Sequence, residues 1–190
     1  AGEPPSVMAA RRRAAELGFT RASDPVAGQL LATLAAAVPP EGRILELGSG
    51  TGVGTAWLVA GLDPRDDVEV TTVETDAQLA AVVRDAGLPA YVRPVEGDAV
   101  ALLPQLGDFD LIFADAEGGK WIGLDLTIAA LRPGGVLVVD DMDLARYSDA
   151  DYREQTTRVR ERLVEDAGLV TVELEAGSGF VLATRRHVAG

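Results

Sequence analysis

Apolar residues along the chain fall in short continuous runs that alternate with longer stretches of helical periodicity. The runs are rich in valine, isoleucine and leucine, as in strands that are covered on both faces. We therefore expect strands at residues 43–47, 68–74, 90–95, 109–115 and 136–140. The intervening stretches predict helices at residues 76–86, 99–106 and 121–131. This alternation is typical of an α/β fold with a doubly wound, mostly parallel sheet.

Both ends of the chain carry local helix signals. Ser23-Asp24-Pro25 places a capping residue before a proline, which predicts a helix over residues 26–38 that stops at Pro39-Pro40. Near Ser148, a pattern that resembles a capping box predicts the start of another helix, which ends at Gly168.

The last part of the chain predicts a pair of strands at residues 169–175 and 180–184. Their glycine-containing connection is short enough for an antiparallel hairpin, so one strand of the sheet is expected to be reversed. No internal repeat or long linker divides the sequence. We expect a single domain over residues 1–190, with N-terminal helices in residues 1–40 and the core in residues 41–186.

The acidic composition narrows the possible partners. The 30 acidic residues outnumber the 17 basic ones, for a net charge of −13. Because nucleic-acid binding normally needs a basic face, no nucleic-acid partner is expected. The chain has no cysteine, which excludes disulfides, thiolate metal sites and cysteine nucleophiles. No apolar run reaches the roughly 18 residues of a membrane span, so we expect no membrane partner and a soluble, cytoplasmic protein.

A glycine-rich loop after the first core strand is the strongest candidate for a ligand site. The sequence from Ile44 to Gly54 is ILELGSGTGVG, in which four glycines alternate between a strand and a helix. Glycine permits positive φ and lets a ligand approach the backbone. The spacing does not fit the dinucleotide fingerprint, which requires a glycine at its sixth position, because the sixth residue is Val53 when counted from Gly48 and Thr55 when counted from Gly50. It does not fit a P-loop either, because no Gly-Lys-Ser/Thr follows. A nicotinamide cofactor is therefore disfavoured.

Acidic residues at the next strand ends are suited to bind a nucleoside. Glu74 ends the second strand, 22 residues after Gly52, where a carboxylate can accept hydrogen bonds from both ribose hydroxyls. Asp98 follows the third strand, within reach of an exocyclic amine of adenine. Taken alone, either acid is more commonly a cap on the helix that it precedes. Together, on successive strand ends of one sheet edge, the two acids are better explained by a ligand.

This arrangement resembles the class I S-adenosylmethionine-dependent methyltransferases from Asp24 to Arg185. The resemblance implies a Rossmann-like, seven-stranded sheet of order 3-2-1-4-5-7-6, with strand 7 antiparallel, and S-adenosylmethionine as the cofactor. It puts Glu46 near the methionine amino group, with a structural hydrogen bond to the loop backbone as the alternative. The residues that it implies for cofactor binding are Glu46, Gly48, Ser49, Gly50, Gly52, Glu74, Thr75, Asp98, Ala99 and Asp115.

Carboxylates also end the fourth and fifth strands. Asp115 ends the strand at 109–115, and Asp140 and Asp141 follow one another at the end of the strand at 136–140. Because these strand ends are neighbours in a doubly wound sheet, the three acids are suited to hold a hard divalent cation such as Mg²⁺, which prefers oxygen ligands. The alternative is that they are strand-end caps exposed to water.

Here the chain resembles the small cation-dependent O-methyltransferases of the catechol and caffeoyl-CoA type. Their pattern is Asp-Ala-Asp-Lys, followed by Asp-Asn at the next strand end, and it implies metal ligation by Asp115, Asp140 and Asp141. The sequence departs from it twice, because Lys120 is shifted by two residues and Asp141 replaces the asparagine. The resemblance implies Lys120 and Asp115 as catalytic residues, with Lys120 as the base. A flexible surface lysine is the alternative.

These patterns predict an S-adenosylmethionine-dependent O-methyltransferase that acts on a hydroxyl of a small molecule with a divalent cation. Two alternatives stay open: a metal-independent methyltransferase for a nitrogen or carboxylate acceptor, and a cofactor-binding module without catalysis. Trp121 is predicted either to wall the acceptor pocket or to pack in the core. Asp24 and Gln29 are minor candidates for ligand contacts. Related enzymes often form dimers, so a homodimer is a further expectation. His187 is expected in the tail, without a catalytic role.

Overall fold

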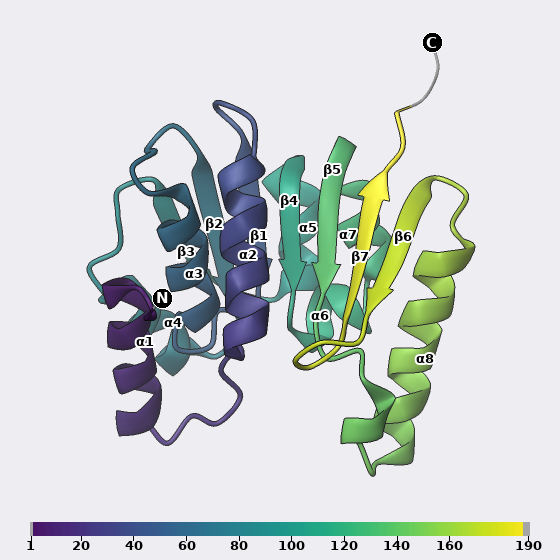
Figure 1. The fold of residues 1–190 in the computed structure, drawn as a ribbon, viewed down its shortest axis with the longest axis horizontal. Helices are drawn as coiled ribbons and strands as arrows, with labels where there is room; N and C mark the ends of the chain where they lie inside the picture. The colour runs from purple at the N-terminus through teal and green to yellow at the C-terminus, as the bar shows by residue number, and fades with distance from the viewer. Residues whose placement is uncertain (1, 188–190) are drawn as a thin grey trace.

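A computed structural model of the chain describes residues 2–187. Its strands are β1 (Arg43–Leu47), β2 (Glu69–Glu74), β3 (Val92–Glu96), β4 (Phe109–Ala114), β5 (Leu131–Val139), β6 (Leu169–Leu174) and β7 (Phe180–Arg185). They form one sheet of order β3-β2-β1-β4-β5-β7-β6, in which β7 is antiparallel to β5 and to β6 (Figure 1). This order and the reversed strand confirm the predicted Rossmann-like methyltransferase fold.

Helices cover both faces of the sheet. They are α1 (Pro5–Glu16), α2 (Pro25–Ala37), α3 (Val53–Leu62), α4 (Ala77–Arg84), α5 (Ala99–Leu106), α6 (Glu117–Lys120), α7 (Leu124–Ala129) and α8 (Ala150–Glu165), with a 3₁₀ turn at Leu144–Arg146. Ile44 and Leu111 point into a core with α1, α2 and α3. The next residues along the same strands, Leu45 and Ile112, point into a second core with α5, α7 and α8. Because neighbouring residues of a strand alternate between the two cores, the central strands carry apolar residues on both faces.

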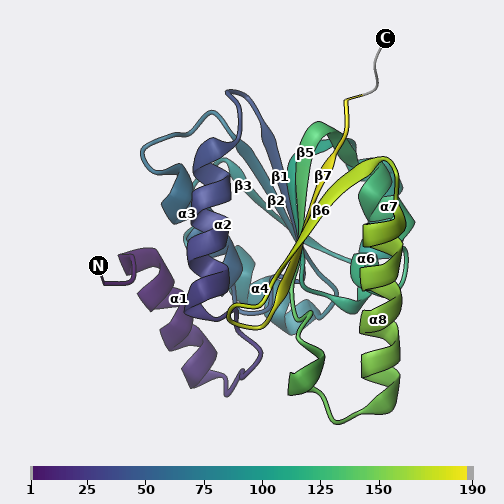
Figure 2. The same ribbon diagram turned by 45° about the vertical axis from the view of Figure 1, so that its right-hand side comes forward.

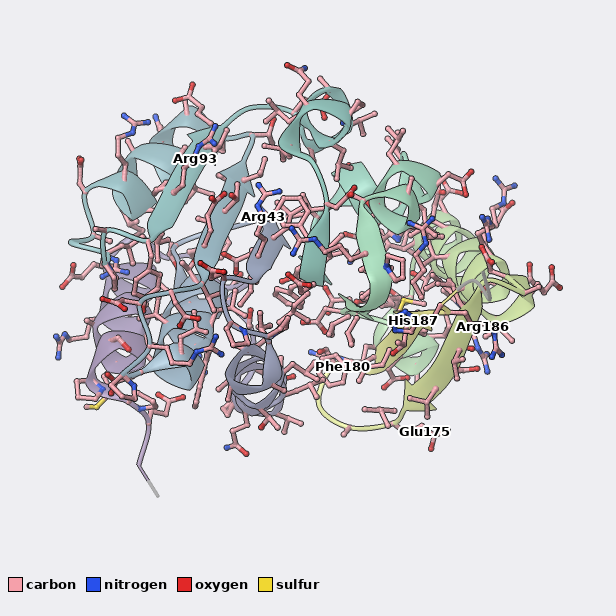
Figure 3. All side chains as sticks on the ribbon, turned by 90° about the horizontal axis from the view of Figure 1, so that it is seen from above. Arg43, Arg93, Glu175, Phe180, Arg186 and His187 are labelled. Carbon is pink, nitrogen blue, oxygen red and sulfur yellow. The ribbon has the colours of Figure 1, made fainter. Side chains whose placement is uncertain are left out.

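The parallel strands all end at one edge of the sheet, which is the lower edge in Figure 1. The loops that follow β1 to β5 therefore meet there, and in Figure 2 the connection from β5 to α8 extends beyond that edge. Figure 3 looks onto the opposite end, where Arg43 begins β1 and His187 follows β7. His187 thus lies away from the edge that carries the predicted site. Among residues 2–187, no helix combines the length and apolarity that crossing a bilayer requires.

The segment around β5 corrects one prediction. The helix predicted over 121–131 is shorter, because Gly123 has φ +81 and α7 starts only at the next residue. Leu131 belongs to β5 and pairs with Phe109, five residues before the predicted strand. A register shift follows between Phe109 and Leu111, since the Arg132-Pro133-Gly134-Gly135 stretch bulges within β5 rather than ending a helix.

Candidate functional site

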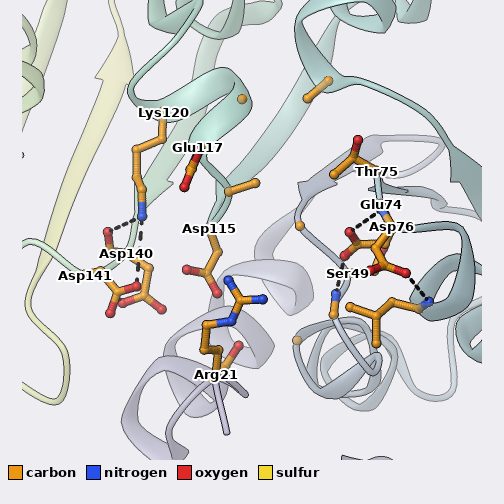
Figure 4. Close-up of a pocket in the computed structure, with 18 of the residues that line it drawn as sticks. Arg21, Ser49, Glu74, Thr75, Asp76, Asp115, Glu117, Lys120, Asp140 and Asp141 are labelled. Carbon is orange, nitrogen blue, oxygen red and sulfur yellow. Dashed lines mark hydrogen bonds and ion pairs between the residues drawn. The ribbon is translucent and has the colours of Figure 1, made fainter. Parts of the chain in front are cut away.

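A cavity of about 920 Å³ lies at the edge of the sheet where the parallel strands end. The loops after β1 to β5, the start of α8 and the segment at residues 19–24 line it. Figure 4 shows two groups of polar side chains in this cavity, with Ser49 and Glu74 on one side and Lys120 and Asp141 on the other. Asp115 lies between the two groups in this view. The fold thus brings the predicted cofactor residues and the predicted reaction residues to one cavity.

The glycine loop curls tightly at its first two alternate glycines. Gly48 has φ +97 and Gly50 has φ +53, conformations that side chains other than glycine rarely adopt. A Cβ at Gly48 would lie 2.9 Å from the carbonyl oxygen of Asp115, and a Cβ at Gly50 would lie 2.9 Å from the ring of Phe19. The loop therefore needs glycine both for its backbone shape and for the close approach of neighbouring segments.

The two acids predicted to bind a nucleoside have different local roles. Glu74 accepts hydrogen bonds from the amides of Gly50 at 2.8 Å and Asp76 at 3.0 Å, and so ties the glycine loop to the end of β2. It does not cap α4, because Asp76 is the capping residue. Asp98 does cap α5, accepting from the Val100 amide at 3.0 Å, and it also lines the cavity. Thr75 and Ala99 line the cavity beside these acids.

Glu46 lies beneath the loop rather than among the residues that line the cavity. Its side chain is 1% exposed, and one carboxylate oxygen accepts hydrogen bonds from the hydroxyls of Thr55 and Thr72. Burial raises the pKa of Glu46 to about 7, since the loss of water outweighs these two hydrogen bonds. The residue thus joins β1, β2 and α3, and its predicted contact with the methionine amino group stays a prediction.

The raised pKa of Glu46 predicts a specific dependence of stability on pH. The folded state holds this proton up to about pH 7, whereas an unfolded chain releases it near the ordinary value of 4.5, so rising pH destabilises the folded state across this window. Urea unfolding at pH 5 and pH 8 should show that the wild type loses about 2 kcal/mol more than Glu46→Gln over this range. The other carboxylates cancel in this comparison. Equal losses in both proteins would contradict the assigned burial effect.

Lys120 is a buried residue at the far end of the cavity from the glycine loop. Only 4% of its surface is exposed, so the alternative of a flexible surface lysine is wrong. Its Nζ donates a hydrogen bond to the carbonyl oxygen of Asp140 at 3.3 Å and lies 4.0 Å from a carboxylate oxygen of Asp141. The ring centroid of Trp121 is 5.3 Å from Nζ, a distance at which cation–π attraction contributes.

The position of Lys120 depends on the turn at Gly119. Gly119 has φ +90, and a Cβ there would lie 2.4 Å from the side chain of Leu47. We expect Gly119→Ala to lower the free energy of unfolding by at least about 2 kcal/mol, through strain and overpacking together. Gly118→Ala is the matched stability control, because φ there is −70 and the added Cβ meets no atom closer than 3.4 Å. Similar urea midpoints for the two variants would contradict this interpretation.

The acids Asp140 and Asp115, which both line the cavity near Lys120, differ in their hydrogen-bond partners. A carboxylate oxygen of Asp140 accepts hydrogen bonds from the Ser178 hydroxyl and from the Asp141 amide, the latter at 2.6 Å. Burial nevertheless raises the pKa of Asp140 to about 6. Asp115 faces the cavity, and its pKa is raised well above the ordinary value by burial and by the charge of Asp140, with Lys120 acting in the opposite direction. Such a carboxylate accepts a proton more readily than an ordinary aspartate does.

The predicted divalent-cation site does not form in this arrangement. Within residues 2–187, no group of three or more metal-ligating side chains is placed to hold a metal ion. One carboxylate oxygen of Asp140 already accepts from Ser178 and the Asp141 amide, and the ammonium of Lys120 lies 4.0 Å from a carboxylate oxygen of Asp141. The acids Asp115, Asp140 and Asp141 therefore do not fit the predicted cation, and the cation requirement stays a prediction that this geometry does not support.

Several residues that line the reaction end of the cavity were not predicted from the sequence. The ring of Tyr152 meets the ring of Trp121 edge-on at 4.2 Å and lies 5.1 Å from that of Tyr147, measured between centroids. These three residues form what we call the aromatic wall. Trp121 lines the cavity and also packs against the second core, so both alternatives for it apply in part. Arg21 enters the cavity from the segment at residues 19–24 (Figure 4). These residues share no sequence motif, so only the fold reveals them.

The two minor candidates on the N-terminal side separate in the structure. Asp24 caps α2 by accepting hydrogen bonds from the amides of Val26 at 2.7 Å and Ala27 at 2.9 Å, and it also lines the cavity. Gln29 lies on an exposed face of α2 and is not among the described residues that line the cavity.

Comparisons with known proteins agree with this geometry. Residues 45–142 match the family described as a methyltransferase domain. A "Putative O-methyltransferase" of Mycolicibacterium smegmatis is 36% identical over 94% of this chain and 90% of its own length. Cofactor-bound Rv0187 from MTB superposes with a TM-score of 0.84 at 30% identity, covering 98% of this chain and 92% of that one. The O-methyltransferase TomG from Streptomyces achromogenes, solved in complex with SAM, superposes with a TM-score of 0.80 at 25% identity, covering 98% and 92%. With its glycine loop, its strand-end acids and its sheet order, the chain belongs to the class I S-adenosylmethionine-dependent methyltransferases.

Proposed function

We propose that the protein transfers the methyl group of S-adenosylmethionine to a hydroxyl group of a small molecule. The observation that carries this proposal is the division of one cavity into a glycine-loop side with Glu74 and a reaction side with Lys120 and the aromatic wall. Its volume of about 920 Å³ is large enough for a nucleoside cofactor together with a small acceptor. Oxygen as the acceptor atom is supported by relatives named as O-methyltransferases.

The residues on the glycine-loop side fit the cofactor. Glu74 is suited to accept hydrogen bonds from the ribose hydroxyls, and Asp98 from the adenine amine, while Gly48 and Gly50 line the cavity with a backbone that a ligand can approach. When bound, the cofactor supplies an electrophilic methyl group, to which the acceptor oxygen bonds as the carbon–sulfur bond breaks and sulfur keeps the electron pair.

The residues on the reaction side prepare the acceptor. The aromatic wall holds the acceptor beside Asp115 and Lys120, which removes the entropic cost of bringing the groups together during the reaction. The Asp115 carboxylate takes up the hydroxyl proton and later releases it to water. The Lys120 ammonium donates a hydrogen bond to the acceptor oxygen and so stabilises the negative charge that develops there.

Incubation with methyl-labelled S-adenosylmethionine and a panel of small phenols, amines and carboxylic acids tests this function. We expect label in a methyl ether, identified by mass spectrometry, with one molecule of S-adenosylhomocysteine formed per ether. Label only in amines or esters would support the second kind of methyltransferase instead. Tight binding of the cofactor without turnover on any acceptor would support the non-catalytic module.

A further inference from the structure

We propose that the ammonium of Lys120 takes the place of the divalent cation in this site, so that the protein binds no divalent cation there and methyl transfer needs none. The inference concerns the reaction side of the proposed function. Its binding test needs no acceptor, so it stays informative whatever the acceptor is.

The backbone between β4 and α7 directs Lys120 over the strand ends. Gly118 is extended, with ψ 123, and Gly119 turns the chain with φ +90. The Gly119 amide donates to the carbonyl oxygen of Ile122 at 2.7 Å, and the Gly119 carbonyl oxygen accepts from the Thr127 hydroxyl at 2.7 Å. These hydrogen bonds hold the turn from both sides. The two-residue shift of the lysine therefore produces a defined position rather than a loose loop.

The surroundings of Lys120 suit a fixed positive charge. A buried ammonium needs negative partners to offset the loss of water, and Lys120 has the carbonyl oxygen of Asp140 at 3.3 Å and a carboxylate oxygen of Asp141 at 4.0 Å. Its charge also acts on the buried carboxyl groups of Asp115 and Asp140. A divalent cation bound to the same acids would lie next to this ammonium and be repelled by it.

The hairpin between β6 and β7 supplies a hydrogen-bond donor to Asp140, one of the three predicted cation ligands. Ser178, at 5% exposure, donates its hydroxyl hydrogen bond to the Asp140 carboxylate. The hairpin is fixed in turn, because its carbonyl oxygens at Ser178 and Gly179 accept from the amides of Asp143 at 3.1 Å and Met142 at 3.0 Å. Ser178 and the Asp141 amide both donate to the same oxygen, Oδ1, so protein donors occupy this oxygen and hold the Asp140 carboxylate in one orientation.

The choice of lysine at position 120 is itself informative. Lys120 is the only lysine of the chain, and every other residue counted as Lys or Arg is arginine. A lysine ammonium is a compact charge with three donors, whereas a guanidinium is a larger planar fork. The other basic residues of the chain are arginines. Position 120 carries lysine because its compact ammonium can fit between the ends of β4 and β5 as a small cation would.

A single lysine also makes the proposal directly testable. The protein is labelled with ¹⁵N at the lysine side chain and saturated with S-adenosylhomocysteine, and its NMR spectrum should show one Nζ signal. Adding Mn²⁺ at one or ten equivalents should not broaden this signal. Calorimetric titration with Mg²⁺ and Mn²⁺ should give no saturable binding below about 1 mM, because the ammonium of Lys120 already occupies the site. Selective loss of the lysine signal, or saturable binding that Asp141→Asn removes, would overturn the proposal.

Variants and a chelator complete the test. Lys120→Met should bind Mn²⁺ at least tenfold more tightly than the wild type, because the acids lose their internal cation, and circular dichroism verifies that the variant is folded. EDTA should change the methyl-transfer rate of the wild type less than twofold once an acceptor is known. Activity that EDTA abolishes and Mg²⁺ restores would overturn the proposal even if Lys120→Met does not fold.

Discussion

Glu74→Ala is expected to weaken the binding of S-adenosylhomocysteine by about 100-fold or more, with little change in the fold. The carboxylate accepts hydrogen bonds from the amides of Gly50 and Asp76, and we propose that it also accepts hydrogen bonds from the ribose hydroxyls. Hydrogen bonds to a charged group contribute about 1.5–3 kcal/mol each, so losing the ribose contacts and the loop anchor together costs at least the ~2.7 kcal/mol that corresponds to 100-fold. Isothermal titration calorimetry measures this change.

The matched control lies on the same strand. Glu69 begins β2 at the opposite end, is exposed, and makes only a surface ion pair with Arg43 at 3.2 Å. Glu69→Ala should leave the affinity within about twofold, because such pairs contribute roughly 0–1 kcal/mol and this one is remote from the cavity. Glu74→Gln, which keeps one acceptor oxygen but no charge, should lie between the two. If Glu74→Ala binds as tightly as Glu69→Ala, the assignment of Glu74 to the cofactor is wrong.

Local periodicity was enough to predict most of the sheet. The strands at β1, β2 and β4 are covered on both faces, so they carry apolar or β-branched residues at neighbouring positions, and glycine or an acid marks their ends. The start of β5 was not predictable in this way, because Leu131 pairs with Phe109 across a bulge that contains proline and two glycines. Local signals mark those residues as a break, and only pairing with β4 makes them a strand.

The two sides of the cavity differ in how far the sequence reveals them. The cofactor side comes from consecutive strand ends, where position in the sequence and position in space agree, so Glu74 and Asp98 could be named in advance. The reaction side is assembled from segments far apart in the chain, such as Arg21, Tyr152 and Ser178. The acids were visible in the sequence, but their partners were not. That is why three carboxylates suggested a cation, although Ser178 donates to Asp140 and the ammonium of Lys120 lies 4.0 Å from Asp141.

Asp115→Asn is expected to lower kcat by about 100-fold or more, the contribution typical of a general base, while cofactor affinity stays within about tenfold. Asparagine has nearly the same shape and keeps an oxygen acceptor toward the cavity, but it cannot take up the hydroxyl proton. Because burial and Asp140 raise the pKa of Asp115, wild-type kcat/KM should fall as pH decreases through that pKa and the base becomes protonated. The variant should lack this acid limb, since amide side chains do not titrate there.

This pH signature separates catalysis from structure at the end of β4. Asp108, exposed and just before the other end of the same strand, provides the control, and Asp108→Asn should keep both kcat and the acid limb. A merely structural role of Asp115 would instead change thermal stability and cofactor affinity without removing the acid limb. Stability is expected to hold or rise in Asp115→Asn at pH 8, because a buried carboxylate with a raised pKa destabilises the folded state once it ionises. If Asp115→Asn keeps the acid limb, another group is the proton acceptor. The next residue to replace is then Asp141, whose side chain is 40% exposed to solvent beside Lys120.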